Sequence, residues 1–96
     1  MLWLILLFST IDQVDYYYFT TEGCIPCKKQ TPIILKLKEE GYDFEFSKDL
    51  KKYKIKVYPT IIIELVDYKN KKVKQIRLEG LHSYKTIKKL LLRVGK

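Results

Sequence analysis

The sequence FTTEGCIPCK, residues 19–28, contains both cysteines of the chain and joins two segments of different periodicity. Before it, residues 15–20 read DYYYFT, an aromatic run that favours a β-strand buried on both faces. After it, apolar residues recur at three- and four-residue spacing up to Leu37, which predicts a helix ending before Gly41. The segment therefore predicts a strand, a short turn and a helix whose start carries the two cysteines.

Cys24 and Cys27 have the spacing at which two cysteines at the start of a helix can close a small disulfide ring. Cys24 lies just outside the predicted helix, where unpaired N–H groups and the helix dipole stabilise a thiolate. This thiolate attacks a substrate disulfide, and Cys27, one turn further and more buried, then displaces the reduced substrate. Pro26 suits the first helical turn, which needs no N–H donor, and Gly23 leaves the approach to the sulfur uncrowded.

Two other interpretations of the cysteine pair stay open at this point. A zinc site needs four ligands and only His82 is otherwise available, so zinc would require a dimer or a poor carboxylate ligand. The pair could also be structural. The order strand, CxxC, helix favours redox chemistry over both. We expect no bound metal or organic cofactor, only a redox-active Cys24–Cys27 disulfide.

The remaining elements follow from periodicity and turn signals. A strand at 42–46 is followed by a short helix capped by Ser47 and reaching about Tyr53. Strands at 60–66 and 73–78 flank a polar turn. A last helix, capped by Ser83, has an apolar stripe of Ile87, Leu90, Leu91 and Val94. The order β-α-β-α-β-β-α predicts an α/β fold, a four-stranded mixed sheet flanked by helices. Its first two strands should be parallel and its last two antiparallel.

The length of 96 residues predicts a single domain, residues 1–96, with a core at about 14–94. Hydrophobic residues make up 47% and charged residues 31%, which excludes disorder, and two cysteines exclude a scaffold of several disulfides. The apolar run Leu2–Phe8 is an extra N-terminal segment, too short to span a bilayer as a helix. We interpret it as retained and packed in a cytoplasmic protein; the alternative is membrane tethering or export through this segment.

The formal net charge is +8, and 17 of the 19 cationic residues are Lys. Specific nucleic-acid recognition relies on Arg for bidentate contacts, and Arg77 and Arg93 are the two arginines here. We therefore expect solvated lysines rather than a specific nucleic-acid site, and no membrane partner. The charge favours acidic partners by steering their encounter.

Four landmarks in the right order resemble the thioredoxin superfamily, and thioredoxin more than glutaredoxin. They are residues 19–28, Pro32 five residues after the second cysteine, the segment YKIKVYPTIII at 53–63, and Glu79-Gly80-Leu81 before a helix. Tyr-Pro-Thr is the form found in protein disulfide isomerase domains. The resemblance covers about residues 14–94, and it implies the thioredoxin fold.

The resemblance also implies a substrate groove beside the two sulfurs. Tyr58–Pro59 would be a cis peptide bond, with Pro59 against the sulfurs and the Tyr58 backbone free to pair with an extended substrate strand. Gly80 would let the substrate backbone approach closely. The groove residues carried over in this way are Gly23, Ile25, Pro26, Tyr58, Pro59, Thr60 and Gly80.

Three residues depart from the family pattern. Gly23 stands where thioredoxins usually have Trp, and Ile25 replaces the usual Gly between the cysteines. Tyr18 stands where the family has a buried acid that accepts the proton of the second cysteine. These departures bear on which reductase recognises the protein and on how fast Cys27 is deprotonated.

The sequence thus predicts a monomeric protein disulfide reductase that works by dithiol–disulfide exchange and serves cell redox homeostasis and electron transport. Its expected partners are disulfide-containing proteins and an electron-donating reductase or glutathione. One alternative is a glutaredoxin-like, glutathione-dependent reductase in which Lys28 and Lys56 hold glutathione carboxylates. Another is a binding module that uses the fold without turnover.

Overall fold

The computed structural model describes residues 11–95, so the predictions made for Leu2–Phe8 lie outside the described residues. The elements are β1 (Gln13–Phe19), α2 (Ile25–Glu39), β2 (Phe44–Phe46), α3 (Leu50–Tyr53), β3 (Thr60–Asp67), β4 (Lys72–Glu79) and α4 (Tyr84–Gly95). This is the predicted order. In residues 11–95 no helix combines the length and the apolar character that crossing a membrane requires.

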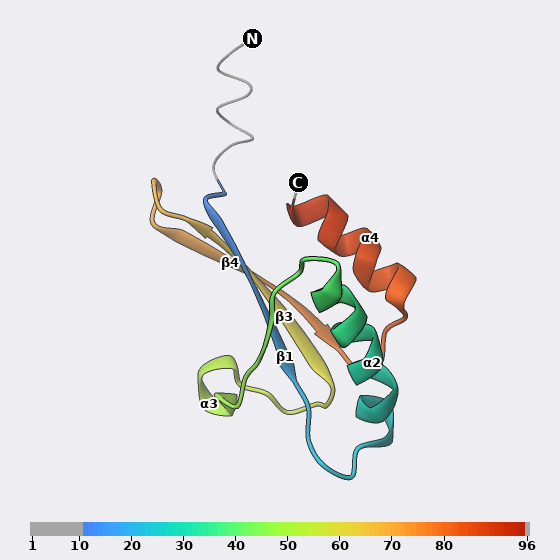
Figure 1. The fold of residues 1–96 in the computed structure, drawn as a ribbon. Helices are drawn as coiled ribbons and strands as arrows, with labels where there is room; N and C mark the ends of the chain where they lie inside the picture. The colour runs from blue at the N-terminus through green and yellow to red at the C-terminus, as the bar shows by residue number, and fades with distance from the viewer. Residues whose placement is uncertain (1–10, 96) are drawn as a thin grey trace.

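The four strands form one mixed sheet in the order β2-β1-β3-β4 (Figure 1). β1 runs parallel to β2 and antiparallel to β3, and β3 pairs antiparallel with β4. β1 and β3 are therefore the central strands. The predicted fold class, a four-stranded mixed sheet flanked by helices, is confirmed.

Both faces of the sheet are covered by helices, α2 and α4 on one face and α3 on the other (Figure 1). Successive residues of a strand point to opposite faces, so Tyr18 packs on the α2 side and Phe19 on the α3 side, both fully buried. The larger core lies under α2 and α4 and contains Tyr18, Ile34, Leu37, Phe44, Ile61, Ile63, Leu65, Ile87 and Leu91. The smaller core is made by Phe19, Tyr53 and Ile62.

Two helix caps were predicted from the sequence, and one of them is wrong. Ser83 caps α4, because its hydroxyl accepts a hydrogen bond from the Thr86 amide at 3.2 Å. The cap of α3 is Asp49 rather than Ser47: the Asp49 carboxylate accepts from the Lys52 amide at 3.2 Å. Asp49 directly precedes the first helical residue, whereas Ser47 accepts from the Asp49 amide one step earlier.

A polar cluster joins the end of α2 to α4. The Glu40 carboxylate accepts hydrogen bonds from the Tyr84 hydroxyl, at 2.7 and 2.9 Å, and from Lys88 Nζ at 2.8 Å. These bonds hold the pKa of Glu40 below its ordinary value, and the bond to Glu40 raises the pKa of Lys88. The cluster therefore helps to keep α4 packed beside α2.

Candidate functional site

A Cys24–Cys27 disulfide lies at the N-terminus of α2. Cys24 is the N-cap residue, and its Sγ accepts a hydrogen bond from the Cys27 amide at 3.2 Å. Cys24 is half-buried and Cys27 is 2% exposed, so Cys24 is the sulfur that a partner can approach. The two sulfurs therefore differ in their access to solvent.

The turn before the cysteines requires a glycine for its backbone. Gly23 has φ +72°, and a Cβ built there would meet no atom within 4 Å. The left-handed conformation costs other residues about 1–2 kcal/mol, so conformation rather than crowding selects glycine. Beyond the turn, Ile25 is 68% exposed and Pro26 is exposed as well. Both side chains between the cysteines therefore face solvent.

Tyr18 lies behind Cys27 with its side chain fully buried. Its hydroxyl is 2.9 Å from Thr31 Oγ1 and donates to the Cys27 carbonyl at 3.4 Å. A pair of hydroxyls thus lies where the resemblance to thioredoxins leads us to expect a buried acid. Thr31 was not singled out from the sequence, although it follows Cys27 by four residues and so shares its helix face.

The Tyr58–Pro59 peptide bond is cis, with Tyr58 half-buried and Pro59 buried. The Gly80 amide donates a hydrogen bond to the Pro59 carbonyl at 2.8 Å, which places the end of β4 beside this loop. Gly80 has φ +88° and open space where a Cβ would lie. The structure therefore brings together Pro59 and Gly80, which are far apart in the sequence.

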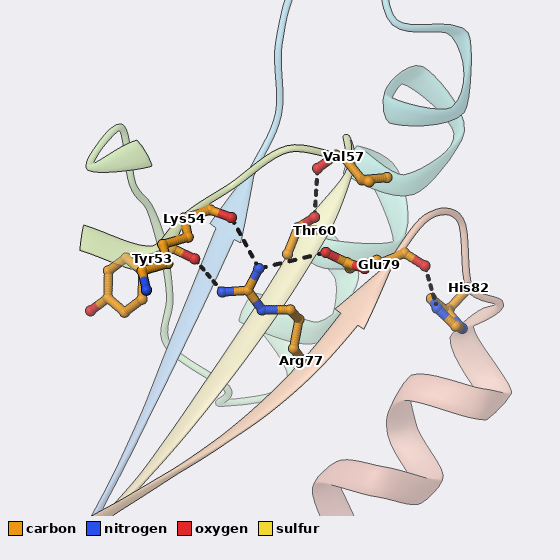
Figure 2. Close-up of polar contacts among 7 residues, drawn as sticks. All are labelled: Tyr53, Lys54, Val57, Thr60, Arg77, Glu79 and His82. Carbon is orange, nitrogen blue, oxygen red and sulfur yellow. Dashed lines mark hydrogen bonds and ion pairs between the residues drawn. The ribbon is translucent and has the colours of Figure 1, made fainter. Parts of the chain in front are cut away.

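The loop that carries Tyr58 and Pro59 is held at both ends (Figure 2). At one end the Arg77 guanidinium donates to the carbonyls of Tyr53, the last residue of α3, and of Lys54, its C-cap. At the other end Thr60 Oγ1 donates to the Val57 carbonyl at 2.6 Å. Thr60 is fully buried, so it supports the loop. The prediction that Thr60 lines the groove is therefore wrong.

Arg77 was missed by sequence reasoning, although its position carries a signal. It pairs with Ile62 across β3 and β4, and Ile62 belongs to the core on the α3 side. Its place in the strand thus directs the guanidinium to the end of α3, where carbonyls lack helical partners. An ion pair of 3.5 Å with Glu79 Oε2 orients it further (Figure 2).

Gln30 connects the cysteine helix to the segment after Gly80. Its side chain is fully buried, and Gln30 Oε1 accepts a hydrogen bond from the His82 amide at 2.8 Å. Gln30 Nε2 has no partner within the described part of the chain. His82 is half-buried, with Nε2 3.2 Å from the Glu79 carbonyl, and so stabilises the same loop (Figure 2). Gln30 was also missed, since a buried glutamine is rare and its sequence position looks like any other helical site.

Two shallow hollows flank the β1–α2 loop. One, of about 450 Å³, is lined by Thr20, Thr21, Glu22, Gly23, Cys27, Lys28, Thr31 and Pro32. The other, of about 300 Å³, is lined by Thr20, Thr21, Glu22, Ser47, Lys48, Leu50 and Tyr58. Lys28 therefore lies near Cys27, as the glutathione alternative requires, whereas Lys56 lines neither hollow. Among the described residues no group of three His, Cys, Asp or Glu side chains could hold a metal ion.

No family model and no curated protein matches the chain. Solved structures do. A chloroplastic thioredoxin z has a TM-score of 0.68 at 19% identity, over 97% of this chain and 88% of that one. Fasciola hepatica thioredoxin has a TM-score of 0.65 at 17% identity, over 96% of this chain and 90% of that one. Schistosoma mansoni thioredoxin has a TM-score of 0.62 at 22% identity, over 97% of this chain and 89% of that one. The chain thus has the thioredoxin fold that its sequence predicts.

Proposed function

We propose that this thioredoxin-fold chain is a thiol–disulfide oxidoreductase that reduces disulfides of other proteins. The observation that carries the proposal is the Cys24–Cys27 disulfide at the N-terminus of α2, with the first sulfur accessible and the second buried. An idle or purely structural pair has no need of this asymmetry. The two interpretations differ in turnover, which can be measured directly.

In the reaction, the reduced protein starts with a thiolate at Cys24. The helix N-terminus and the Cys27 amide, which donates a hydrogen bond to Cys24 Sγ in the disulfide form, would stabilise this charge. The thiolate attacks one substrate sulfur, a mixed disulfide forms, and the other substrate sulfur leaves as a thiolate that takes up a proton. Cys27 then loses its proton and attacks Cys24 Sγ, and the second substrate sulfur leaves. Two electrons pass to the substrate, and the Cys24–Cys27 disulfide remains.

The substrate groove proposed for this reaction comprises Gly23, Ile25, Pro26, Tyr58, Pro59 and Gly80. The hydrogen bond between Gly80 and Pro59 and the open space at Gly80 support it. An extended substrate segment would pair with the Tyr58 backbone, a mode in which main-chain bonds supply affinity with little sequence preference. A reductase or another dithiol would return electrons to the Cys24–Cys27 disulfide.

Insulin reduction with dithiothreitol as electron source tests the proposal. Wild type should accelerate the reduction, whereas Cys24→Ser should not, because it lacks the attacking sulfur. Cys27→Ser, reduced and then freed of dithiothreitol before insulin is added, should instead accumulate a mixed disulfide with insulin, detectable by mass spectrometry. No acceleration by wild type over Cys24→Ser would contradict the proposal and favour a binding module without turnover.

A glutathione-dependent reductase is the second candidate, because Lys28 lies in the hollow next to Cys27 and could meet a glutathione carboxylate. The two candidates differ in their electron donor. Turnover supported by glutathione and glutathione reductase, and lowered by Lys28→Gln, would favour the second candidate. Turnover supported by a dithiol alone would favour the first.

A further inference from the structure

Three exposed apolar side chains lie on the three segments that form the candidate site: the cysteine motif, the cis-peptide loop and the segment after Gly80. Ile25, between the cysteines, is 68% exposed, Val57, just before the cis peptide, is 41% exposed, and Leu81, just after Gly80, is 45% exposed. The hydrogen bond from Gly80 to Pro59 joins the segment that carries Leu81 to the loop that carries Val57. The hydrogen bond from His82 to Gln30 joins the Leu81 segment to α2. We call Ile25, Val57 and Leu81 the apolar rim. It offers a bound polypeptide a hydrophobic contact around the reactive sulfur.

Lysines accompany the apolar rim. Lys28 lines the hollow that contains Cys27, and Lys48 lines the neighbouring hollow that contains Tyr58. Lys56 directly precedes Val57 of the rim. All three lysines are exposed, and neither of the two ion pairs found in residues 11–95 involves them. Their charges are thus available to a partner.

The carboxylates near the site balance these lysines only in part. Glu79 is in an ion pair with Arg77, and Asp49 accepts the Lys52 amide as the cap of α3. Glu22, which lines both hollows, is the one carboxylate among their lining residues in the described part of the chain. A backbone amide does not neutralise Asp49, so Lys28, Lys48 and Lys56 face two carboxylates without an ion pair, Glu22 and Asp49, and these five residues together remain positive.

We infer that the Cys24–Cys27 site selects polypeptide disulfides flanked by acidic and apolar residues, an inference that rests on the proposed function. Acidic flanks complement Lys28, Lys48 and Lys56, and apolar neighbours complement the rim. Charge complementarity of this kind raises the rate of association more than the final affinity. Glutathione has carboxylates but no apolar side chain for the rim, so a polypeptide fits the surface better.

Two disulfide-cyclised peptides of equal length test the inference, one with Glu and one with Lys beside each cysteine. The rate constant of each peptide with reduced protein is divided by its rate constant with dithiothreitol, so that intrinsic reactivity cancels. Wild type should reduce the acidic peptide about tenfold faster at low salt. Raising the salt from about 0.01 M to about 1 M shortens the screening length from about 30 Å to about 3 Å, so the preference should fall toward one.

Two triple variants separate the local charge from the net charge. Lys28→Gln, Lys48→Gln and Lys56→Gln together should remove most of the preference. The matched control replaces Lys69 and Lys71 of the β3–β4 turn and Lys74 of β4 by Gln, and it should keep the preference. The turn lies at the opposite end of the sheet from the site (Figure 1). If the first triple variant does not fold, Lys48→Gln alone should lower the preference.

Three outcomes would overturn the inference alone: equal normalised rates for both peptides in wild type, an unchanged preference in the Lys28, Lys48 and Lys56 variant, or an equal loss in both triple variants. Glutathione disulfide reduced as fast as the acidic peptide would overturn the polypeptide preference. Reduction of neither peptide, together with no activity on insulin, would instead contradict the proposed function itself.

Discussion

The Tyr18 hydroxyl lies 2.9 Å from Thr31 Oγ1 and donates to the carbonyl of Cys27, so a strand and a helix share one buried polar contact behind the disulfide. The resemblance to thioredoxins places Tyr18 where that family has a buried acid. In this chain the contact is made by hydroxyls, and it fixes the first turns of α2 against β1. The helix that carries the cysteines is thus anchored to the central strand next to the buried Cys27.

Tyr18→Phe should lower the free energy of unfolding by about 1–3 kcal/mol, because the Cys27 carbonyl and Thr31 lose a buried partner. Thr31→Val should have a smaller effect of the same sign. The double variant should cost less than the sum of the two single variants, since both remove the same hydrogen bond. Urea unfolding of the four proteins measures these values, and strictly additive losses would show that the two hydroxyls do not act together.

Arg77→Ala should impair reduction of protein substrates more than reduction of a small aromatic disulfide. The guanidinium holds the end of α3, and with it the loop that carries Tyr58 and Pro59. In the proposed groove an extended polypeptide contacts this loop, whereas a small disulfide does not reach it. Arg77→Lys should not rescue the defect, because an ammonium cannot bridge two carbonyls as a planar fork does.

The control for this prediction is Arg93→Ala, because Arg93 is exposed on α4. It should leave both activities unchanged. Parallel losses on the protein and the small substrate in Arg77→Ala would indicate general destabilisation instead of a role in positioning the loop.

Gly80→Ala should lower stability by about 1–2 kcal/mol, since φ +88° lies in the region that L-residues avoid. A methyl group there meets no atom of the protein, but it would meet the backbone of a substrate bound in the proposed groove. Gly80→Ala should therefore also raise KM for protein disulfides. Gly41→Ala is a matched control, with φ +106° and equally open space but at the other end of α2. It should lose stability without a specific rise in KM for protein disulfides. Equal KM values in the two variants would count against Gly80 as a groove residue.

The Glu40 cluster should make stability depend on pH. Hydrogen bonds from Lys88 and Tyr84 lower the pKa of Glu40 in the folded state, so its contribution is present above the unfolded pKa of about 4.3 and is lost as the pH falls through the folded pKa. Lys88, whose pKa is raised, contributes below about 10.4 and loses this contribution as the pH rises through its folded pKa.

Urea unfolding of Glu40→Gln and wild type measures this dependence. The difference between the two proteins should be clear at about pH 7 and should shrink as the pH falls below about 4.3 and through the lowered folded pKa of Glu40, because the carboxylate becomes protonated there. Glu39→Gln, one residue earlier and exposed, is the control and should show a smaller difference at neutral pH. A Glu40→Gln effect that persists unchanged in acid would exclude the carboxylate charge as its cause.

Much of the fold was predictable, because its signals are local. The burial of residues 18 and 19 on opposite faces follows from strand periodicity, and the start of α2 follows from Pro26 and the apolar spacing. The cap of α3 was mispredicted because Ser47 and Asp49 both favour that role and only the first helical residue, Leu50, decides between them. Helix ends depend on the direction in which the chain leaves, which local preference fixes poorly.

The features of the candidate site likewise divide into those that local sequence determines and those that tertiary structure decides. The sequence alone determined the cysteine pair, its place at a helix start and the identity of Cys24 as the outer sulfur, because spacing and helix geometry are local properties. Tertiary structure decided that Thr60 is buried, that Arg77 holds the α3 end, and that Gln30 links the cysteine helix to His82. These contacts join residues more than 20 positions apart, except for Thr60. Their formation depends on how the sheet brings its strands together, which no local pattern records.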